Sequence, residues 1–396
     1  MRPLALLALL GACTATETPR NLEPVAQGAA YQAEYRTPDI ARRDSAEALL
    51  RSERLNLAEC RAARGGNKYG GPPAVLRGTR LSRGDLLDVR VEEDETFSGA
   101  QEVSRDGTVR LPFLDPVQAV GRTVDSIEAE IARQLVAGEF YDDAPRVSVR
   151  LADLAPVRVA VSGAVFEPQA LILGGVSGAD RDVLRQGALG ASTEARDLSA
   201  ALRAAGGIRP DADLSAVELR RAGTRHILDL RGIFDGTDIR DVILVTGDEI
   251  TVPSRDCFQN DLMRPSPVSP PGVSLFLSNL TVPAAGNAVS AVGRDVREVP
   301  WGTRYLQAVI DTNCVGGTKP TSATRSAVLF SRNPVTGVSV VIERDIEDLL
   351  RRADRDDYDP YLLPGDAIAC YDSAVTGLRD VAAAVGIVLG AGAILE

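Results

Sequence analysis

Apolar and polar residues alternate in short runs along most of the chain, and this alternation predicts strands with one buried face. Three of these runs begin with a Gly-Asp turn, at residues 84–89, 247–252 and 365–370. The residues expected on the buried side are Leu87, Val89, Ile250, Val252, Ile368 and Cys370. The aspartates Asp85, Asp248 and Asp366 are interpreted as turn-forming, because Asp side chains hydrogen-bond the backbone of tight turns.

The chain contains a longer repeat, in which an extended run, a helix ending in glycines, a strand and a Gly-Asp strand follow one another. The first copy has these parts at residues 157–161, 198–207, 216–219 and 247–252. The second copy has them at residues 273–277, 305–317, 326–330 and 365–370. This order predicts two compact α+β units. A proline-rich segment at 262–272 predicts a stiff, extended linker between them.

A different unit is expected ahead of the repeat, at residues 81–155. Asp106-Gly107 lies between alternating apolar residues and predicts a tight hairpin. Thr123 is placed to cap a helix. The apolar residues of that helix share one face and are Val124, Ile127, Ile131 and Leu135. An alternating strand at 145–151 closes the unit.

The start of the chain has the pattern of a bacterial secretion signal, with Met1-Arg2 ahead of an apolar run from Leu4 to Leu10. This run is too short to span a membrane. The sequence Leu10-Gly11-Ala12-Cys13 resembles a lipobox, in which Cys13 becomes the acylated N-terminus and acyl chains such as palmitate hold the protein on a membrane. Thr14 then favours the outer membrane by resemblance to lipoprotein sorting rules. The alternative is an ordinary signal peptide that contains Cys13.

The end of the chain is apolar, and Arg379 and Asp380 are its only charges between residues 373 and 395. As a helix this segment would extend about 34 Å, which matches a hydrocarbon core of about 30 Å. Ala382, Gly386 and Gly390 recur every four residues, so neighbouring helices could approach closely along this row. Three structures fit the pattern: a pore-lining helix, a plain bilayer anchor and a packed core helix.

Composition restricts the possible partners and cofactors. The net charge of −11 disfavours a nucleic-acid partner. Four cysteines follow Cys13, an even number in an oxidising compartment, and they allow three pairings among Cys60, Cys257, Cys314 and Cys370. Cys370 could equally be a small core residue. The only histidine, His226, lies on a predicted strand surface, so no metal or other cofactor is expected.

No enzyme motif was found, which favours a protein that is not an enzyme. The chain lacks a Gly-x-Ser-x-Gly elbow, a phosphate-binding Gly-x-x-x-x-Gly-Lys loop and a His-Glu-x-x-His helix. The acidic run at 354–359 lacks the glycine and the bidentate glutamate of an EF-hand. It is interpreted as a solvated loop that follows a helix at 342–353.

The order of these patterns resembles the outer-membrane polysaccharide export proteins, which are capsule and exopolysaccharide translocon lipoproteins with polysaccharide-export and SLBB β-grasp domains. The resemblance rests on Gly84-Asp85, the segment from Asp106-Gly107 to Leu111-Pro112, Gly121-Arg122-Thr123 before Glu128-Ala129, Tyr141 with 145–149, and 161–168. The chain departs from the family pattern at Gln169, at Asp115-Pro116 and in a glycine-rich insertion at 174–190.

The resemblance implies a fold class and a domain order. The class is α+β, and the domains are a signal peptide (1–12), an N-terminal anchor segment (13–80), an export domain (81–155), a first β-grasp domain (156–261), the proline-rich linker (262–272), a second β-grasp domain (273–372) and a C-terminal transmembrane helix (373–396).

The resemblance also implies a homo-oligomeric ring, lipid-anchored in the outer membrane with most of the chain in the periplasm. Its porin-like channel would export a polysaccharide, and an inner-membrane polysaccharide co-polymerase would dock on the export domain. A rival hypothesis is a monomeric periplasmic glycan-binding lipoprotein with an anchoring tail. Oligomeric state separates the two, because one narrow helix encloses a channel only when several copies close into a ring.

Overall fold

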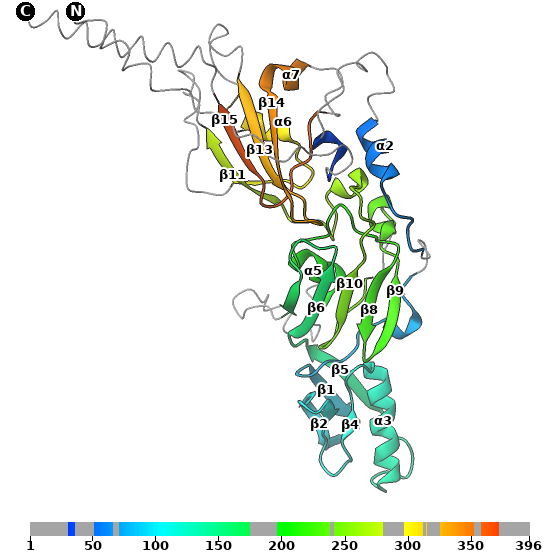
Figure 1. Cartoon of the computed structure of the whole chain (residues 1–396). Coiled ribbons are helices and arrows are strands. Elements are labelled where there is room, and N and C mark those ends of the chain that lie inside the picture. Colours follow the sequence, from blue (N-terminus) through cyan, green and yellow to red (C-terminus); the bar gives the residue numbers. More distant parts are fainter. Residues whose placement is uncertain are drawn as a thin grey trace, which may run out of the picture. The chain divides into compact units, whose positions relative to one another are not determined.

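The computed structural model describes residues 31–35, 51–65, 71–174, 196–237, 241–279, 297–311, 314, 325–351 and 358–371. These residues form four β-sheets and few helices, so the predicted α+β class is confirmed (Figure 1). They group into two compact units. One unit draws on residues 61–255 and 266–270, and the other on residues 1–60, 256–265 and 271–396. We call them the export unit and the C-terminal unit.

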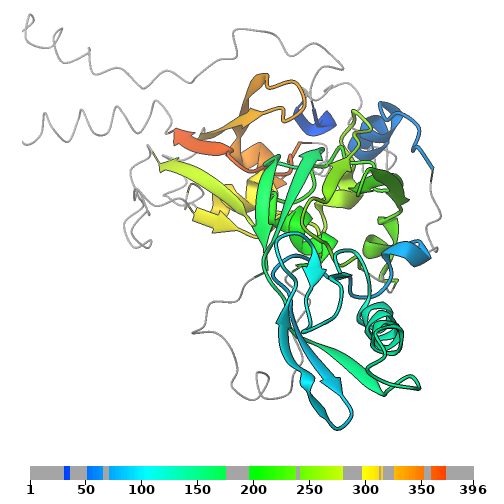
Figure 2. The same ribbon diagram turned by 90° about the horizontal axis from the view of Figure 1, so that it is seen from below.

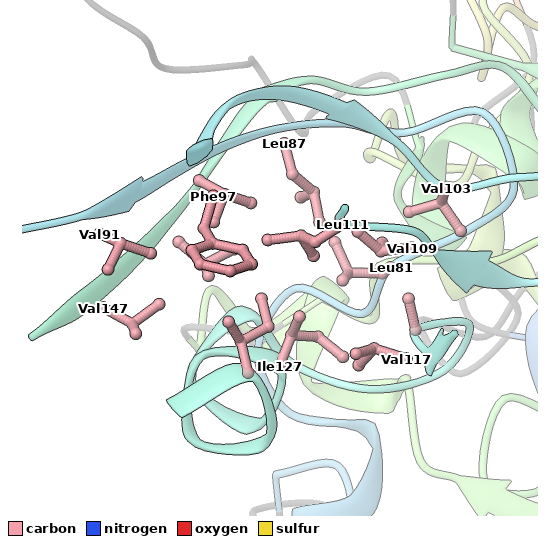
Figure 3. Close-up of a cluster of buried hydrophobic side chains, with 14 of the residues drawn as sticks. Leu81, Leu87, Val91, Phe97, Val103, Val109, Leu111, Val117, Ile127 and Val147 are labelled. Atoms are coloured by element: carbon pink, nitrogen blue, oxygen red, sulfur yellow. The ribbon is translucent and has the colours of Figure 1, made fainter. Parts of the chain in front are cut away.

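The export unit begins with a three-stranded antiparallel sheet of order β2-β1-β5. Its strands are β1 (Leu86–Val91), β2 (Asp94–Glu102) and β5 (Val147–Asp153), and a two-stranded sheet adds β3 (Thr108–Val109) and β4 (Val117–Gln118). A short 3-10 helix, η4 (Ala74–Leu76), precedes them. Figure 3 shows the apolar core, where Leu87 and Phe97 from the sheet meet Ile127 from a helix.

That helix is α3 (Val124–Ala137), which lies against β5 (Figure 1, Figure 2). The Thr123 side chain accepts a hydrogen bond from the Ser126 amide at 3.4 Å, as expected of an N-cap. Ile127, Ile131 and Leu135 are fully buried. The predicted helix, its cap and its buried face are therefore confirmed.

The hairpin predicted at Asp106-Gly107 is only partly correct. A tight turn is present, with Gly107 at φ +89° and its amide donating to the Ser104 carbonyl at 2.9 Å. The Ser104 amide also donates to the Thr108 carbonyl across the turn at 2.8 Å, but the regular pairing of β3 is with β4. Local alternation marked the turn correctly, but the pairing partner is set by contacts further along the chain.

The export unit also contains a five-stranded sheet of order β7-β6-β10-β8-β9. Its strands are β6 (Val157–Gly163), β7 (Gln169–Leu173), β8 (Val217–Arg221), β9 (Thr224–Leu228) and β10 (Glu249–Val252). Helix α5 (Leu198–Ala204) contacts β6 and β7, and the 3-10 helix η6 (Arg231–Asp235) follows β9. Strands β6 and β10 are parallel, and the other neighbouring pairs are antiparallel.

The C-terminal unit contains a second five-stranded sheet of order β12-β11-β15-β13-β14. Its strands are β11 (Val273–Asn279), β12 (Arg297–Val299), β13 (Ser326–Arg332), β14 (Ser339–Asp345) and β15 (Ala367–Tyr371). Its helices are α6 (Tyr305–Asp311) and α7 (Ile346–Arg351). Both sheets use their strands in the same order, and both contain one parallel pair. The repeat predicted from the sequence is therefore confirmed.

The prediction of a helix at 342–353 is wrong for its first residues. Residues 339–345 form β14, and α7 covers only Ile346–Arg351. Val340, Ile342 and Arg344 are buried while their neighbours are not, and β14 pairs with β13 along its whole length. Pairing with a neighbouring strand outweighed the helical spacing that the sequence suggested.

The proline-rich segment lies against the first repeat. Val268 and Ser269 are buried, and the Ile208 amide donates to the Val268 carbonyl at 3.0 Å. Gly207 has φ +80°, and a Cβ there would come within 2.2 Å of the Pro270 nitrogen. A glycine is therefore required where this segment crosses the end of α5.

Residues from the N-terminal region belong to the C-terminal unit. They form the 3-10 helix η1 (Ala33–Tyr35) and helix α2 (Arg51–Ala58), and the 3-10 helix η7 (Asn260–Met263) lies in the same unit. Gln32, Glu34 and Tyr35 are buried. Disulfides join Cys60 to Cys257 and Cys314 to Cys370, which selects one of the three pairings that the sequence allowed.

Both predicted membrane-contacting ends, Cys13 and the tail from residue 373, lie outside the described residues. Within the described parts of the chain, each helix is too short or too polar to cross a bilayer.

Candidate functional site

The three Gly-Asp turns have the same hydrogen bonds. In each, a carboxylate oxygen of the aspartate accepts from the backbone N–H three residues earlier: Ser82 to Asp85 at 2.7 Å, Val245 to Asp248 at 2.9 Å and Leu363 to Asp366 at 2.9 Å. The glycines have φ of +84°, +95° and +88°, as a type II turn requires. The predicted turn-forming role of these aspartates is confirmed.

Asp85 also joins the export domain to the first repeat. One of its oxygens accepts from the Arg196 guanidinium at 2.8 Å and from the Ala155 amide at 2.9 Å. Arg196 in turn donates to the Leu244 carbonyl at 3.1 Å, beside the second Gly-Asp turn. Both charged side chains are almost completely buried. Burial raises the pKa of the Asp85 carboxyl, and the positive charge of Arg196 acts in the opposite direction.

The second aspartate has its own arginine. Arg221 donates to both carboxylate oxygens of Asp248, at 2.9 and 2.6 Å, and to the Ile243 carbonyl at 2.8 Å. This two-point geometry is the strong form of an arginine–carboxylate pair. The two arginines therefore stabilise the strand ends on both sides of the junction between the export domain and the first repeat.

The third aspartate is bound differently. Strand pairing aligns Leu219 with Ile250 in the first sheet and Leu329 with Ile368 in the second. Two residues further along these strands, Arg221 and Ser331 occupy the same position. Ser331 hydrogen-bonds Asp366, and its hydroxyl shares a hydrogen bond of 3.0 Å with the Tyr35 hydroxyl.

Removal from water dominates the electrostatics of the third turn. Burial raises the pKa of the Asp366 carboxyl to about 7, although hydrogen bonds from Ser331 and the Leu363 amide lower it. Burial, and then the charge of Asp366, raise the pKa of the Tyr35 hydroxyl well above its ordinary value. Gln32 Nε2 donates to the same hydroxyl at 2.9 Å, so the polar chain extends into the N-terminal segment.

The surface of the export domain has a groove of about 610 Å³ between β5 and α3. Charged side chains of both signs line it, among them Arg90, Glu92, Glu128 and Arg146. Glu128 accepts from the Val149 amide at 3.1 Å and so occupies a donor on the outer edge of β5. The groove is mixed in charge and shows no preference for an anion or a cation.

One end of the export domain carries an aromatic surface, which we call the aromatic tip and define as Phe113 and Phe140. The side chains are 79% and 43% exposed, and their ring centroids lie 6.4 Å apart. Beneath them the buried Phe97 contacts Phe140 edge-on at 5.2 Å. Tyr141 donates to Asp94 at 2.7 Å, which lowers the pKa of that carboxyl and fixes the tip to the β1–β2 hairpin.

The described residues bring together no group of three potential metal ligands. His226 is half-buried on β9, an edge strand of the first repeat, as the sequence analysis placed it. The buried Gly-Asp turns and their arginine, serine and tyrosine partners are suited to holding strands and domains in fixed positions.

The sequence-predicted site residues are Cys13 for the lipid and Ala382, Gly386 and Gly390 for helix contacts, and all four lie outside the described residues. Sequence reasoning missed Arg196, Ser331 and Tyr35 as partners of the turn aspartates. The repeat itself held one usable signal, because aligning its strands places Arg221 opposite Ser331. Arg196 and Tyr35 come from outside the aligned strands, and no local pattern identifies them.

Comparison with known proteins agrees with the geometry of the first domain. No curated protein matches the chain. Residues 73–152 match the sequence model of the polysaccharide biosynthesis/export proteins, and this range contains β1 to β4, α3 and most of β5. Residues 73–152 are therefore a domain of the polysaccharide biosynthesis/export type, and this domain supports a role in polysaccharide export.

Proposed function

We propose that the protein is an outer-membrane lipoprotein whose copies form a ring-shaped channel for capsular or extracellular polysaccharide. The match of residues 73–152 to the export family carries the proposal. The buried Arg196–Asp85 pair supports it, because the pair fixes the export domain to the first repeat within one compact unit. Subunits that enclose a lumen need such rigid internal junctions.

We assign the two five-stranded sheets to β-grasp domains of the SLBB type. Each has five strands in the same order, one parallel pair and a helix between its second and third strands in sequence. In the proposed ring these domains form the wall of a periplasmic vestibule, and the polymer makes weak, exchangeable contacts there. A sliding hydrated polymer needs no tight site, so we assign no catalytic residue and no cofactor.

The proposed location is the periplasmic face of the outer membrane. The Leu10-Gly11-Ala12-Cys13 sequence supports a lipid on Cys13. The disulfides Cys60–Cys257 and Cys314–Cys370 are consistent with an oxidising compartment. The driving force comes from elsewhere, and an inner-membrane co-polymerase is the proposed partner of the export domain.

The proposed pore is formed by the tails, one helix from each copy. The small residues Ala382, Gly386 and Gly390 would let neighbouring helices pack closely. A tail that only anchors the protein would need no such row. Removal of a pore-forming tail should abolish export, whereas removal of a tail that only anchors the protein should not.

A truncation tests this proposal. A protein ending at Ser373 keeps Cys13 and all described domains, so we expect a folded, lipidated protein that no longer supports surface polysaccharide. Gly386→Arg in the full chain should also reduce export, while the matched Gly386→Ala keeps the row small and should preserve it. Surface polysaccharide is measured by immunoblotting of intact cells. Full export by the truncated protein would exclude the pore and leave the monomeric binding lipoprotein as the better account.

A further inference from the structure

The aromatic tip is exposed without being loosely held. Phe113 is the most exposed of the large apolar side chains in the described part of the chain. Phe140 contacts Phe97 edge-on. Figure 3 shows Phe97 in the core of the export domain. Rigid aromatic side chains that lose little freedom on binding are typical of interaction hot spots.

Exposed carboxylates lie on the segments that meet at the aromatic tip, since Asp94, between Glu93 and Glu95, accepts a hydrogen bond from Tyr141 beside Phe140. They come from the β1–β2 hairpin, the loop after Phe113 and the segment after α3, and are Glu93, Glu95, Asp115, Glu139, Asp142 and Asp143. All six are exposed, and none forms an ion pair with a described residue. The nearby arginines pair with other carboxylates: Arg90 with Asp88, Arg110 with Asp106 and Arg146 with Glu92.

Exposed aromatic rings beside carboxylates favour a binding partner that is both apolar and positively charged. An anionic lipid surface or an anionic polymer would be repelled by the carboxylates, although either could contact the rings. A cationic segment would be attracted from a distance and then bury the two rings. We infer that the aromatic tip is a docking surface for a protein partner that presents an apolar side chain flanked by lysine or arginine.

This inference deepens the proposed function, and it rests on that function only in taking the export domain to meet another protein. It specifies the chemistry of that contact. Binding at the tip can be measured on purified protein without any export, so its failure is distinguishable from failure of the channel proposal.

The direct experiment uses the purified full chain and a fluorescein-labelled amphipathic peptide of leucine and lysine with one apolar face. Fluorescence anisotropy gives Kd at about 0.05 M and about 0.3 M NaCl, on either side of physiological ionic strength. We expect binding that weakens at the higher salt concentration. Phe113→Ser should raise Kd by about tenfold or more, since an exposed hot-spot ring is lost.

A second variant tests the charge requirement separately. Glu93→Gln with Glu139→Gln should raise Kd about fivefold at low salt and flatten the salt dependence, because rim charges act mainly on long-range attraction. Glu93 and Glu139 have positive φ (59° each), so the fold of this variant is checked by its unfolding temperature. If it misfolds, Glu95→Gln with Asp115→Asn tests the same requirement.

Matched controls alter equally exposed residues elsewhere. Ile172 on β7 is 67% exposed, so Ile172→Ser removes a comparable apolar side chain. Glu59→Gln with Glu102→Gln removes two exposed charges that are not among the six carboxylates. Both controls should leave Kd within about twofold. An equal loss in the controls, or unchanged binding by Phe113→Ser, would overturn the inference.

Competing ligands provide the remaining outcomes. Vesicles of anionic phospholipid and a neutral dextran should show no Phe113-dependent binding, and such binding to either would contradict a protein partner. In cells, Phe113→Ser should lower surface polysaccharide, while the detergent-extracted protein should still form ring-shaped oligomers. Loss of these oligomers would show that the tip joins copies of this chain, which would also overturn the inference.

Discussion

The two five-stranded sheets share one strand order but hold their buried aspartates by different means. In the first sheet, Asp248 is matched by two hydrogen bonds from Arg221. In the second, the equivalent position is Ser331, and the partner beyond it is Tyr35 from the N-terminal segment. A carboxylate removed from water needs either a cation or a proton. The first repeat uses the cation, and the pKa of about 7 for Asp366 indicates that the second uses the proton.

This difference shows how a repeat can diverge without changing its fold. Replacing the long guanidinium by a serine leaves room beside the turn, and a tyrosine from a distant segment fills it. The second repeat also contains a covalent link, Cys314–Cys370, and the other disulfide, Cys60–Cys257, lies in the same compact unit. The shared turn survives because its backbone hydrogen bonds are local, while the partners of its aspartate can change.

The largest expected effect is the pH dependence of the C-terminal unit. The folded pKa of Asp366 is raised to about 7 from 3.8, so stability is lost as pH rises from about 4 to about 7. The loss can reach about 4 kcal/mol at about 1.4 kcal/mol per unit of pKa. Asp366→Asn should remove it. Fluorescence of the only tryptophan, Trp301, follows unfolding of this unit, and parallel pH profiles of the two proteins would refute the prediction.

The next effect concerns the disulfides. Cys314→Ala with Cys370→Ala opens a loop that spans 56 residues and should destabilise the C-terminal unit by about 4 kcal/mol. Cys60→Ala with Cys257→Ala should destabilise the C-terminal unit less while the export unit is folded. The Arg61 amide donates to the Arg255 carbonyl at 3.0 Å, so the folded export unit already holds the residues next to Cys60 and Cys257 close together. Urea unfolding followed by Trp301 fluorescence compares them, and equal losses would contradict this reasoning.

In the first repeat, loss of the cation should destabilise the export unit. Arg221→Met leaves Asp248 buried without its partner, and we expect a cost of about 3 kcal/mol. Adding Asp248→Asn should recover part of this loss, because the uncompensated charge disappears. Far-UV circular dichroism reports both units and Trp301 fluorescence only the C-terminal unit, so an unfolding transition seen by dichroism alone belongs to the export unit. A single variant as stable as the double variant would show that the pair does not stabilise the fold.

The smallest expected effect is at the tyrosine. Tyr35→Phe removes the hydroxyl that bonds Ser331 and Gln32 but keeps the ring, and should cost about 1 kcal/mol. Tyr35→Ala with Ser331→Arg should go further and rebuild the arrangement of the first repeat. A cation beside Asp366 lowers its pKa, so the stability loss between pH 4 and 7 should shrink. A pH profile identical to that of the unchanged protein would argue against the equivalence of Arg221 and Ser331.

Much of the fold could be predicted from local patterns. The alternation that placed Leu87, Ile250 and Ile368 inside depends only on neighbouring residues, and so does the Thr123 cap. Contacts that join distant segments could not be predicted, because Tyr35 and Ser331 are separated by 296 residues. Strand β14 was misread at 342–345 because its apolar spacing also fits a helix, and only its pairing with β13 decides between them.

The candidate site was less accessible to sequence reasoning than the fold. The predicted residues Cys13, Ala382, Gly386 and Gly390 rest on patterns at the two ends, and they remain predictions. The aromatic tip carries no sequence signature, because exposure of Phe113 and Phe140 follows from how three separate segments meet. Its carboxylates are spread over residues 93 to 143 and gather only in the folded domain.

Assembly of many copies around a lumen is the central claim, and electron microscopy of the detergent-purified full chain tests it most directly. We expect ring-shaped particles with a central cavity. A homogeneous population of single subunits would contradict the channel and favour a monomeric glycan-binding lipoprotein.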